Sequence, residues 1–125
     1  MDPYEKPAIT VPDSELPAEL LIEDLIVGDG PVASAGTTVN VDYVGVSWST
    51  GAEFDASWER GDTLSFKLGS GMVISGWDQG VDGMAVGGRR KLTIPPHLGY
   101  GAQGAGGVIA PNETLIFVVD LRSLG

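Results

Sequence analysis

The chain has 125 residues, of which 42% are hydrophobic, and it carries a formal net charge of −10 at pH 7. This length predicts a single domain that can bury a hydrophobic core. The acidic charge argues against a nucleic-acid partner, because phosphates would be repelled. The lack of cysteine excludes disulfides and thiolate metal sites. No apolar run approaches the roughly 20 residues that cross a membrane, and the N-terminus lacks the basic and apolar regions of a signal peptide, so we expect a cytoplasmic protein without a membrane partner.

Residues 1–18 combine four prolines with several acidic residues and show no helical or strand periodicity. Such a composition is typical of a flexible or loosely docked leader, which is the interpretation that we favour. Ile9 and Val11 leave an alternative open, in which the segment is an extended arm lying on the sheet. The folded domain is expected over residues 19–125.

The first part of this domain predicts two strands. One is expected over residues 20–27, with a break or bulge at Glu23–Asp24, and the glycine-rich turn 28–31 ends it. A second, longer strand is expected over residues 38–48, which are rich in β-branched and aromatic side chains.

A hairpin turn at residues 49–51 leads into a return strand over 53–57. This strand is interrupted by polar residues and resumes over 63–68, where apolar and polar side chains alternate with a period of two. We therefore expect two pieces of one return strand.

The next segment predicts a short amphipathic helix. Ser75 and Asp78 form an S-x-x-D pattern, which favours a capping box at the helix start. Trp77, Val81 and Met84 then fall on one face of a helix of about two turns. A helix this short is marginal alone, so its apolar face must be covered.

The last part predicts strands over residues 89–94 and 114–124, joined by a long glycine-rich loop over 95–112. Loops of this length in a compact domain are usually functional. Short connections between sequential strands, together with one helix, predict an α+β fold in which an antiparallel sheet has one face covered by the helix.

Several catalytic classes fail on the residues present. The only histidine, His97, lies in a proline-bounded turn without a carboxylate at short spacing, so we interpret it as a surface residue. The acidic residues are scattered singly, so no metal site and no cofactor are predicted. The segment Gly99–Gly104 matches a dinucleotide-binding pattern, but prolines precede it and glycines follow it, which indicates a loop. The basic triplet 89–91 is interpreted as a solvated face of a strand.

The three tryptophans have different predicted surroundings. Trp77 lies on the apolar helix face and is either a core residue or the floor of a pocket. Trp48 precedes a turn and is expected to pack at the surface, whereas Trp58 interrupts the return strand and is expected at a rim.

What remains is an apolar, aromatic set of residues with few titratable groups. Such a set suits rotation about an Xaa-Pro amide, which has a barrier near 20 kcal/mol and needs neither a nucleophile nor a proton transfer. An apolar pocket favours the twisted amide, which has lost its resonance and is less polar than the planar form. The members of this set are Tyr43, Phe54, Phe66, Val73, Ile74, Trp77, Tyr100, Val108, Ile109 and Phe117.

These residues lie in a series of motifs spread over the domain. The motifs are VDYVG at 41–45, FDAS at 54–57, VISGWDQGVDGMAVG at 73–87, RRKLTIP at 89–95, GYG at 99–101, VIAP at 108–111 and LIFVV at 115–119. Together they resemble FKBP-type peptidyl-prolyl cis-trans isomerases over about residues 19–124. The resemblance implies a strongly twisted antiparallel β-sheet wrapped around one short α-helix, and rotamase activity that assists protein folding.

The resemblance also implies roles in catalysis. Trp77 is similar to the indole beneath the proline ring, and Tyr100 resembles the phenol that donates to a bound carbonyl. Asp55 resembles the carboxylate beside the twisted amide, and Arg60 matches a charged position that can pair with it. Ile74 matches the position whose backbone amide donates to the ligand.

Other matched positions form the rest of the implied binding site. Tyr43, Phe54 and Phe117 resemble its side walls. Val108 and Ile109 match the hydrophobic tip of the loop 95–112, which we call the flap. Val73 matches the rim, Phe66 matches the core behind the pocket, and Leu64 occupies a wall position.

Three residues depart from the best-known members of this family. Leu64 stands in place of phenylalanine, Met72 in place of glutamate, and Ala105 in place of a histidine in the flap. These departures bear on substrate preference more than on activity.

The implied partners are proline-containing peptides, unfolded proteins and macrolide inhibitors, and we expect a monomer. An alternative function is a non-catalytic module that binds a proline-containing peptide or a macrolide. Retention of Asp55 and Tyr100 favours the enzyme over this module.

Overall fold

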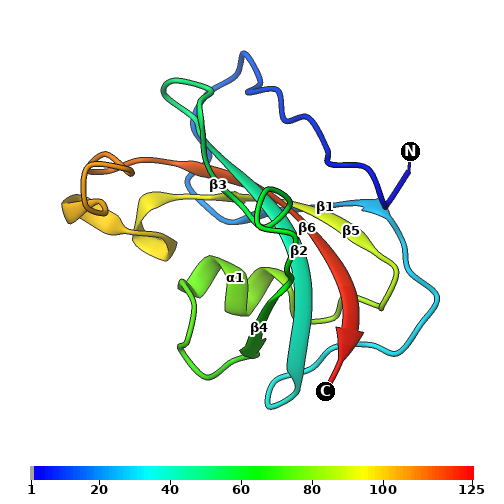
Figure 1. The fold of residues 1–125 in the computed structure, drawn as a ribbon. Coiled ribbons are helices and arrows are strands. Elements are labelled where there is room, and N and C mark those ends of the chain that lie inside the picture. Colours follow the sequence, from blue (N-terminus) through cyan, green and yellow to red (C-terminus); the bar gives the residue numbers. More distant parts are fainter. Residues whose placement is uncertain (1) are drawn as a thin grey trace.

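The computed structural model describes residues 2–125, which form an antiparallel six-stranded sheet curved around one short helix (Figure 1). The strand order is β1-β5-β6-β2-β3, and β4 also pairs with β2. The predicted α+β fold is confirmed. Its elements are β1 (Leu21–Ile26), β2 (Thr38–Ser47), β3 (Glu53–Ala56), β4 (Leu64–Lys67), α1 (Ser75–Gly80), β5 (Arg89–Ile94), the 3-10 turns η1 (Pro96–Leu98) and η2 (Gly101–Gln103), and β6 (Leu115–Leu124).

The two longest strands, β2 and β6, form the centre of the sheet. They pair from Val39 opposite Leu124 to Ser47 opposite Leu115. β3 and β4 both pair with β2, β3 near its C-terminal end and β4 near its N-terminal end. The predicted interrupted return strand therefore corresponds to β3 and β4, which lie along the same side of β2. Residues 57–63, between these two strands, leave the sheet.

The helix α1 lies against the concave face of the sheet (Figure 1). Trp77, Val81 and Met84 are all buried in the core, as the apolar spacing predicts. The helix ends at Gly80, however, so Met84 reaches the core from the turn that follows. A Cβ atom added at Gly76 would come within 2.6 Å of Ile94, so glycine permits this close approach of helix to β5.

The predicted capping box is not formed. Ile74 is the N-cap residue and Ser75 is already inside the helix, so no side chain caps the first turn. The carboxylate of Asp78 instead accepts the backbone N–H groups of Gly69 at 2.8 Å and Gly71 at 3.0 Å. Asp78 thus fixes the loop before the helix rather than the helix end.

The interpretation of residues 89–91 as a solvated face is wrong for the first arginine. Arg89 is 2% exposed and its Nε donates to the buried carboxylate of Asp120 at 2.7 Å. Arg90 is half-buried and donates to Asp24 on β1 and to the backbone oxygens of Gly80 and Asp82. Both arginines are held by groups that only the folded sheet brings near them.

The predicted break in the first strand is a register shift in an otherwise continuous strand. β1 pairs with β5 from Leu21 onward, and the shift lies between Asp24 and Ile26. Leu25 is therefore the extra, unpaired residue of the bulge, and it comes immediately after the predicted pair Glu23–Asp24.

Among residues 2–125, no helix is long and apolar enough to cross a membrane.

The segment before β1 lies along the face of the sheet opposite α1 (Figure 1). We call residues 2–18 the N-terminal arm. Its backbone oxygens at Pro3 and Glu5 accept hydrogen bonds at 2.7 Å from Arg122 and Arg89, respectively. Its Lys6 pairs with Glu53 at 2.7 Å and also with Glu59. The arm thus contacts strands β3, β5 and β6 through Lys6 and its backbone oxygens.

A small apolar cluster lies between the arm and the sheet. Ile9 and Trp58 pack against the buried residues Val44, Ala56 and Val118. Trp58 was expected at the rim of a pocket, but it is half-buried in this cluster with the Arg122 guanidinium 5.3 Å from its ring centre. Its position follows from the break between β3 and β4, which turns the indole to the outer face.

Candidate functional site

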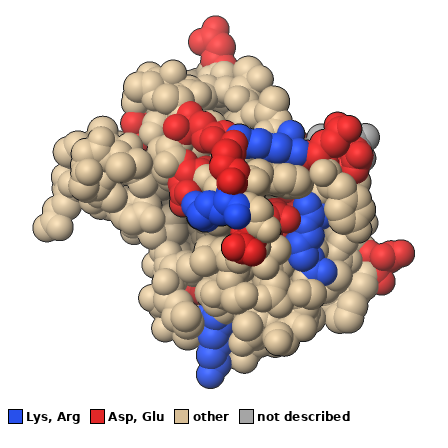
Figure 2. Space-filling model, viewed as in Figure 1, with Lys and Arg blue, Asp and Glu red and all other residues tan. Residues whose placement is uncertain are grey.

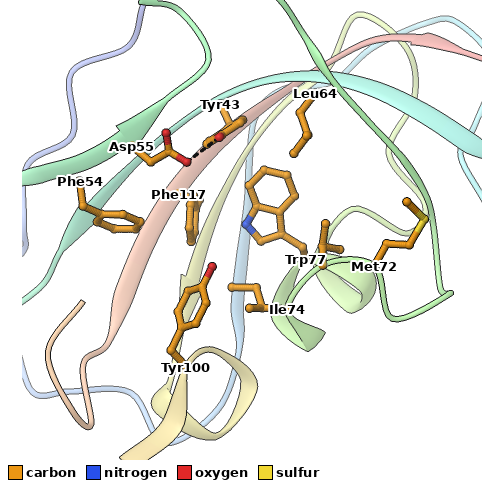
Figure 3. A pocket seen from close by; sticks show the side chains of 10 residues that line it. Tyr43, Phe54, Asp55, Leu64, Met72, Ile74, Trp77, Tyr100 and Phe117 are labelled. Carbon is orange, nitrogen blue, oxygen red and sulfur yellow. Dashed lines mark hydrogen bonds between the residues drawn. The ribbon is translucent and has the colours of Figure 1, made fainter. Parts of the chain in front are cut away.

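A cavity of about 490 Å³ opens between the concave face of the sheet and the start of α1 (Figure 3). Strands β2, β3, β4 and β6 supply its walls, and the loop before α1 and the start of the flap supply its rim. Its lining combines nine residues that the sequence proposed with Met72, which the sequence noted only as a departure. The lining residues are Tyr43, Phe54, Asp55, Leu64, Met72, Val73, Ile74, Trp77, Tyr100 and Phe117.

The indole of Trp77 forms the floor of the cavity and is only 4% exposed. Tyr43 and Phe117 meet it edge-on, with ring centres 5.0 Å and 5.2 Å away. Phe66 supports it from behind at 5.7 Å. Edge-to-face contacts are a favourable arrangement of aromatic rings, so the floor is assembled from the protein's own side chains without a ligand.

Gly45 on β2 makes the aromatic wall possible, and sequence reasoning missed it. Phe54 and Phe117 meet edge-on over this residue, with ring centres 5.5 Å apart. A Cβ atom at position 45 would come within 2.6 Å of the Phe117 ring and 2.8 Å of the Phe54 ring. The signal available in the sequence was a glycine inside a strand, which often marks a close approach of other groups.

Of the described residues 2–125, Asp55 is the only carboxylate that lines the cavity, and two neighbours bond to it (Figure 3). The Tyr43 hydroxyl donates to its Oδ2 at 2.6 Å, and Arg60 Nη1 donates to its Oδ1 at 2.8 Å. Arg60 also donates to the Tyr43 hydroxyl oxygen at 2.7 Å, which closes the network. The pairing of Arg60 with Asp55 that the resemblance implied is present in the structure.

This network keeps Asp55 ionised near neutral pH. Burial opposes its ionisation, but the hydrogen bonds from Tyr43 and Arg60 together outweigh burial, and the pKa of the carboxyl is lowered. Burial and the bond to Asp55 raise the pKa of the Tyr43 hydroxyl. The Asp55 carboxylate raises the pKa of Arg60, which stays charged. The network therefore holds an ionised Asp55 carboxylate paired with the positive charge of Arg60.

Tyr100 stands across the cavity mouth from this network (Figure 3). It lies between η1 and η2 and is 40% exposed. Burial, and then the charge of Asp55, raise the pKa of its hydroxyl. Tyr100 is therefore a neutral hydrogen-bond donor at the opening.

The family model described as FKBP-type peptidyl-prolyl cis-trans isomerase matches residues 30–122. The chain belongs to this family. It is 67% identical over 118 residues to an FK506-binding protein of Streptomyces anulatus, covering 94% of this chain and 95% of that one. It is 53% identical over 103 residues to an FK506-binding protein of Neisseria meningitidis serogroup A, covering 82% and 93% of the two chains. The crystal structure of AtFKBP13 is similar with a TM-score of 0.78 and 39% identity, covering 85% of this chain and 93% of that one.

In this FKBP-type chain, two of the three departures lie at the cavity. Leu64 lines the wall and Met72 lies at the rim with 64% of its surface exposed. Ala105 lies in the flap, where its backbone pairs with that of Ile109, and it does not line the cavity. The first two departures can therefore touch a ligand directly.

Three of the proposed site residues lie outside the main cavity. Phe66 is buried behind Trp77. Val108 is 59% exposed at the flap tip and Ile109 is buried beneath it, and both line a neighbouring cavity. The flap contains no charged residue, and the corresponding lobe in Figure 2 carries no coloured atoms.

The donor set of this FKBP-type site does not suit a metal ion. The carboxylate of Asp55 lines the cavity, and Tyr43 and Arg60 already bond to it. Among residues 2–125, no group of three or more metal-ligating side chains comes together. His97 is exposed in η1 and does not line the cavity.

Proposed function

We propose that the main cavity, which has Trp77 as its floor and which we call the Trp77 cavity, binds an Xaa-Pro segment of a polypeptide. It lowers the barrier to rotation about the amide of that segment. One observation carries this proposal: the lining, as described for residues 2–125, is an aromatic cavity with the Asp55 carboxylate and two phenols and without an acid–base pair. Amide rotation breaks no covalent bond, so it needs no such pair.

The cavity acts on the difference in polarity between the planar and the twisted amide. The planar amide loses its hydration on entering an apolar cavity, and the twisted amide, with less charge separation, loses less. Each ~1.4 kcal/mol of preference for the twisted form increases the rate about tenfold.

Each residue is assigned a role that its position supports. Trp77 lies beneath the proline ring, and the Tyr100 hydroxyl donates to a carbonyl of the bound segment. The negative charge of Asp55 faces the carbonyl carbon as the amide twists, while Tyr43 and Arg60 keep that charge oriented. The backbone N–H of Ile74 is outside the hydrogen-bond ladder of α1, since Ile74 is the N-cap, and is available to a ligand.

The wall composition supports a preference for a bulky apolar residue before proline. Phe54, Leu64 and Phe117 line the cavity with apolar surface. The same surface would accept unfolded client proteins, and a macrolide should compete with them. The names of the relatives from Streptomyces and Neisseria support the macrolide.

A protease-coupled assay on peptides with leucine or glutamate before proline tests the proposal. We expect faster isomerisation of the Leu-Pro peptide and competitive inhibition by the macrolide. Trp77→Leu should weaken the binding of both, whereas Trp48→Phe, far from the cavity lining, should not. Macrolide binding without acceleration of any peptide would instead identify a binding module.

The cytoplasmic location, the monomeric state and the lack of a nucleic-acid partner stay predictions from the sequence. Sedimentation of the purified chain would test the oligomeric state.

A further inference from the structure

A second cavity of about 500 Å³ lies beside the first, between the β2–β3 hairpin and the flap. It is not part of the site described above. Phe54 lines both cavities, so one aromatic side chain separates them. The other lining residues are Ser47, Ser49, Thr50, Ala52, Glu53, Gln103, Gly107, Val108, Ile109, Ala110, Pro111 and Glu113.

Glu113 is the unusual residue of this second cavity. Only two acidic side chains in residues 2–125 are buried, Asp120 and Glu113, with 0% and 8% of their surface exposed. Asp120 has Arg89 as its counter-ion at 2.7 Å. Among the same residues, no lysine, arginine or histidine lies within 4.0 Å of the Glu113 carboxylate.

Among residues 2–125, only Ser49 donates hydrogen bonds to the Glu113 side chain. Its backbone N–H donates to Glu113 Oε2 at 3.1 Å, and its hydroxyl donates to Oε1. A carboxylate can accept about four hydrogen bonds, so further donors can be accommodated. A buried carboxylate without a cation is costly, and a ligand that brings a positive charge would remove that cost.

We propose that this second cavity binds a lysine or arginine side chain of the same polypeptide whose proline occupies the Trp77 cavity. The proposal rests on the proposed function, because one chain must occupy both cavities. Glu113 is the counter-ion, and the apolar residues Phe54, Ile109 and Pro111 contact the aliphatic stem of the side chain. Ser49 and Gln103 offer further oxygen acceptors for the charged end.

The shared wall limits where the basic residue can be. An extended chain advances about 3.4 Å per residue, so adjacent cavities are reached within one to three residues of the proline.

The charge of the surrounding surface also favours a basic ligand. Glu53, at the rim, is paired with Lys6, and the chain as a whole carries a net charge of −10. A basic segment is therefore attracted and an acidic one repelled.

The experiment uses peptides that keep Leu-Pro constant and place lysine, glutamine or acetyl-lysine at each of three positions on either side. We expect one position at which lysine increases kcat/KM at least about tenfold over glutamine, mainly through KM. Acetyl-lysine should lose the gain, because acetylation removes the charge and keeps the length. In E113Q the lysine-to-glutamine ratio should fall close to one, while the matched variant D62N keeps it.

Equal rates for lysine and glutamine peptides in the wild-type chain would overturn the proposal, as would a preference that persists in E113Q. The acetyl-lysine comparison needs no variant, so it remains usable even if E113Q does not fold. A gain confined to one position and lost on acetylation supports a localised counter-ion, whereas a similar gain at every position would indicate only attraction by the net charge of −10 and would overturn the proposal. Failure of the proposed function is distinguishable, because then no peptide is isomerised, the neutral ones included. Calorimetric titration with the lysine and acetyl-lysine peptides would still test the second cavity in that case.

Discussion

The Asp55, Tyr43 and Arg60 side chains work as one group. Arg60 is exposed to solvent, yet it bonds to both partners, and Tyr43 is fixed in turn against Trp77. The position of the Asp55 carboxylate therefore depends on Tyr43, which packs against the Trp77 indole at the cavity floor. Its pKa is lowered, whereas the pKa values of Tyr43 and Tyr100 are raised.

These shifts predict how activity depends on pH. The pKa of Asp55 is lowered and those of Tyr43 and Tyr100 are raised, so all three groups titrate further from neutrality than the free side chains do. We expect kcat/KM to be flat from about pH 6 to 8.5, and to fall only in acid, where Asp55 gains a proton. Asp55→Asn should have a lower rate without this acid limb. The profile would be measured with His97→Ala as the control, and a midpoint near 6.5 that disappears in the control would contradict it.

The Tyr100 hydroxyl should matter more than the nearby histidine. Tyr100→Phe removes one donor at the cavity mouth, worth roughly 1 kcal/mol, so kcat/KM should fall about fivefold. His97→Ala, in the exposed turn η1, should keep more than half of the wild-type value. Equal losses in the two variants would argue against a hydrogen bond from Tyr100 to the substrate.

The pairing of β5 with β6 buries an ion pair in the sheet. Arg89 and Asp120 stand directly opposite each other across the two strands. Burial raises the pKa of the Asp120 carboxyl, and this effect is larger than the opposite effect of the hydrogen bond from Arg89. The pair is thus costly to bury and more costly to break.

Replacement of one partner should therefore destabilise the protein more than replacement of both. Asp120→Leu leaves Arg89 without its carboxylate and should lower the free energy of unfolding by about 3–5 kcal/mol. The double variant Arg89→Met, Asp120→Leu should recover a large part of that loss. Urea denaturation of the wild-type chain, the two single variants Asp120→Leu and Arg89→Met, and the double variant measures this. If the double variant lost the sum of the two single effects, the two side chains would be energetically independent.

The N-terminal arm joins both halves of the sheet from outside. It accepts hydrogen bonds from Arg89 on β5 and Arg122 on β6, and its Lys6 bonds to Glu53 on β3. Arg122 also donates to Asp42 on β2 at 2.9 Å. Contacts of this kind are expected to contribute to stability, in contrast to a free leader.

Deletion of residues 1–18 distinguishes the two interpretations. If the arm is bound, deletion should cost about 2 kcal/mol or more, since two buried or half-buried arginines lose acceptors, and Tm should fall by on the order of 5–10 °C. A free leader predicts no change. Ile9→Ala should show part of the loss and Leu16→Ala none, because Leu16 is 61% exposed. An unchanged Tm on deletion would support the free leader.

The sequence predicted the elements whose formation depends on local patterns of apolar and polar residues. The period of two over Leu64, Phe66 and Leu68 indicated the strand, and the spacing of Trp77 and Val81 indicated the buried helix face. The aromatic residues of the cavity were also found, because the motifs that carry them resemble a known family.

The errors share one physical cause, which is that long-range partners override local preference. Asp78 is three residues after Ser75, but it bonds to the loop at Gly69 instead. Arg89 is charged, yet Asp120, distant in sequence, holds it in the core. Gly45 has no side chain to suggest its function, which is to leave space for Phe54 and Phe117.

The separate surroundings of the three tryptophans make their emission a natural reporter. Of the three, only Trp77 lines the main cavity, whereas Trp58 packs with the arm residue Ile9, and Trp48 lines a crevice with the arm prolines Pro12 and Pro17. Quenching by a ligand in the cavity should thus come from one indole, and detachment of the arm should alter the other two. In a chain with Trp77→Phe, a change in tryptophan emission would report only on the arm. The intrinsic fluorescence of this protein can therefore distinguish occupation of its cavity from movement on its opposite face without any added dye.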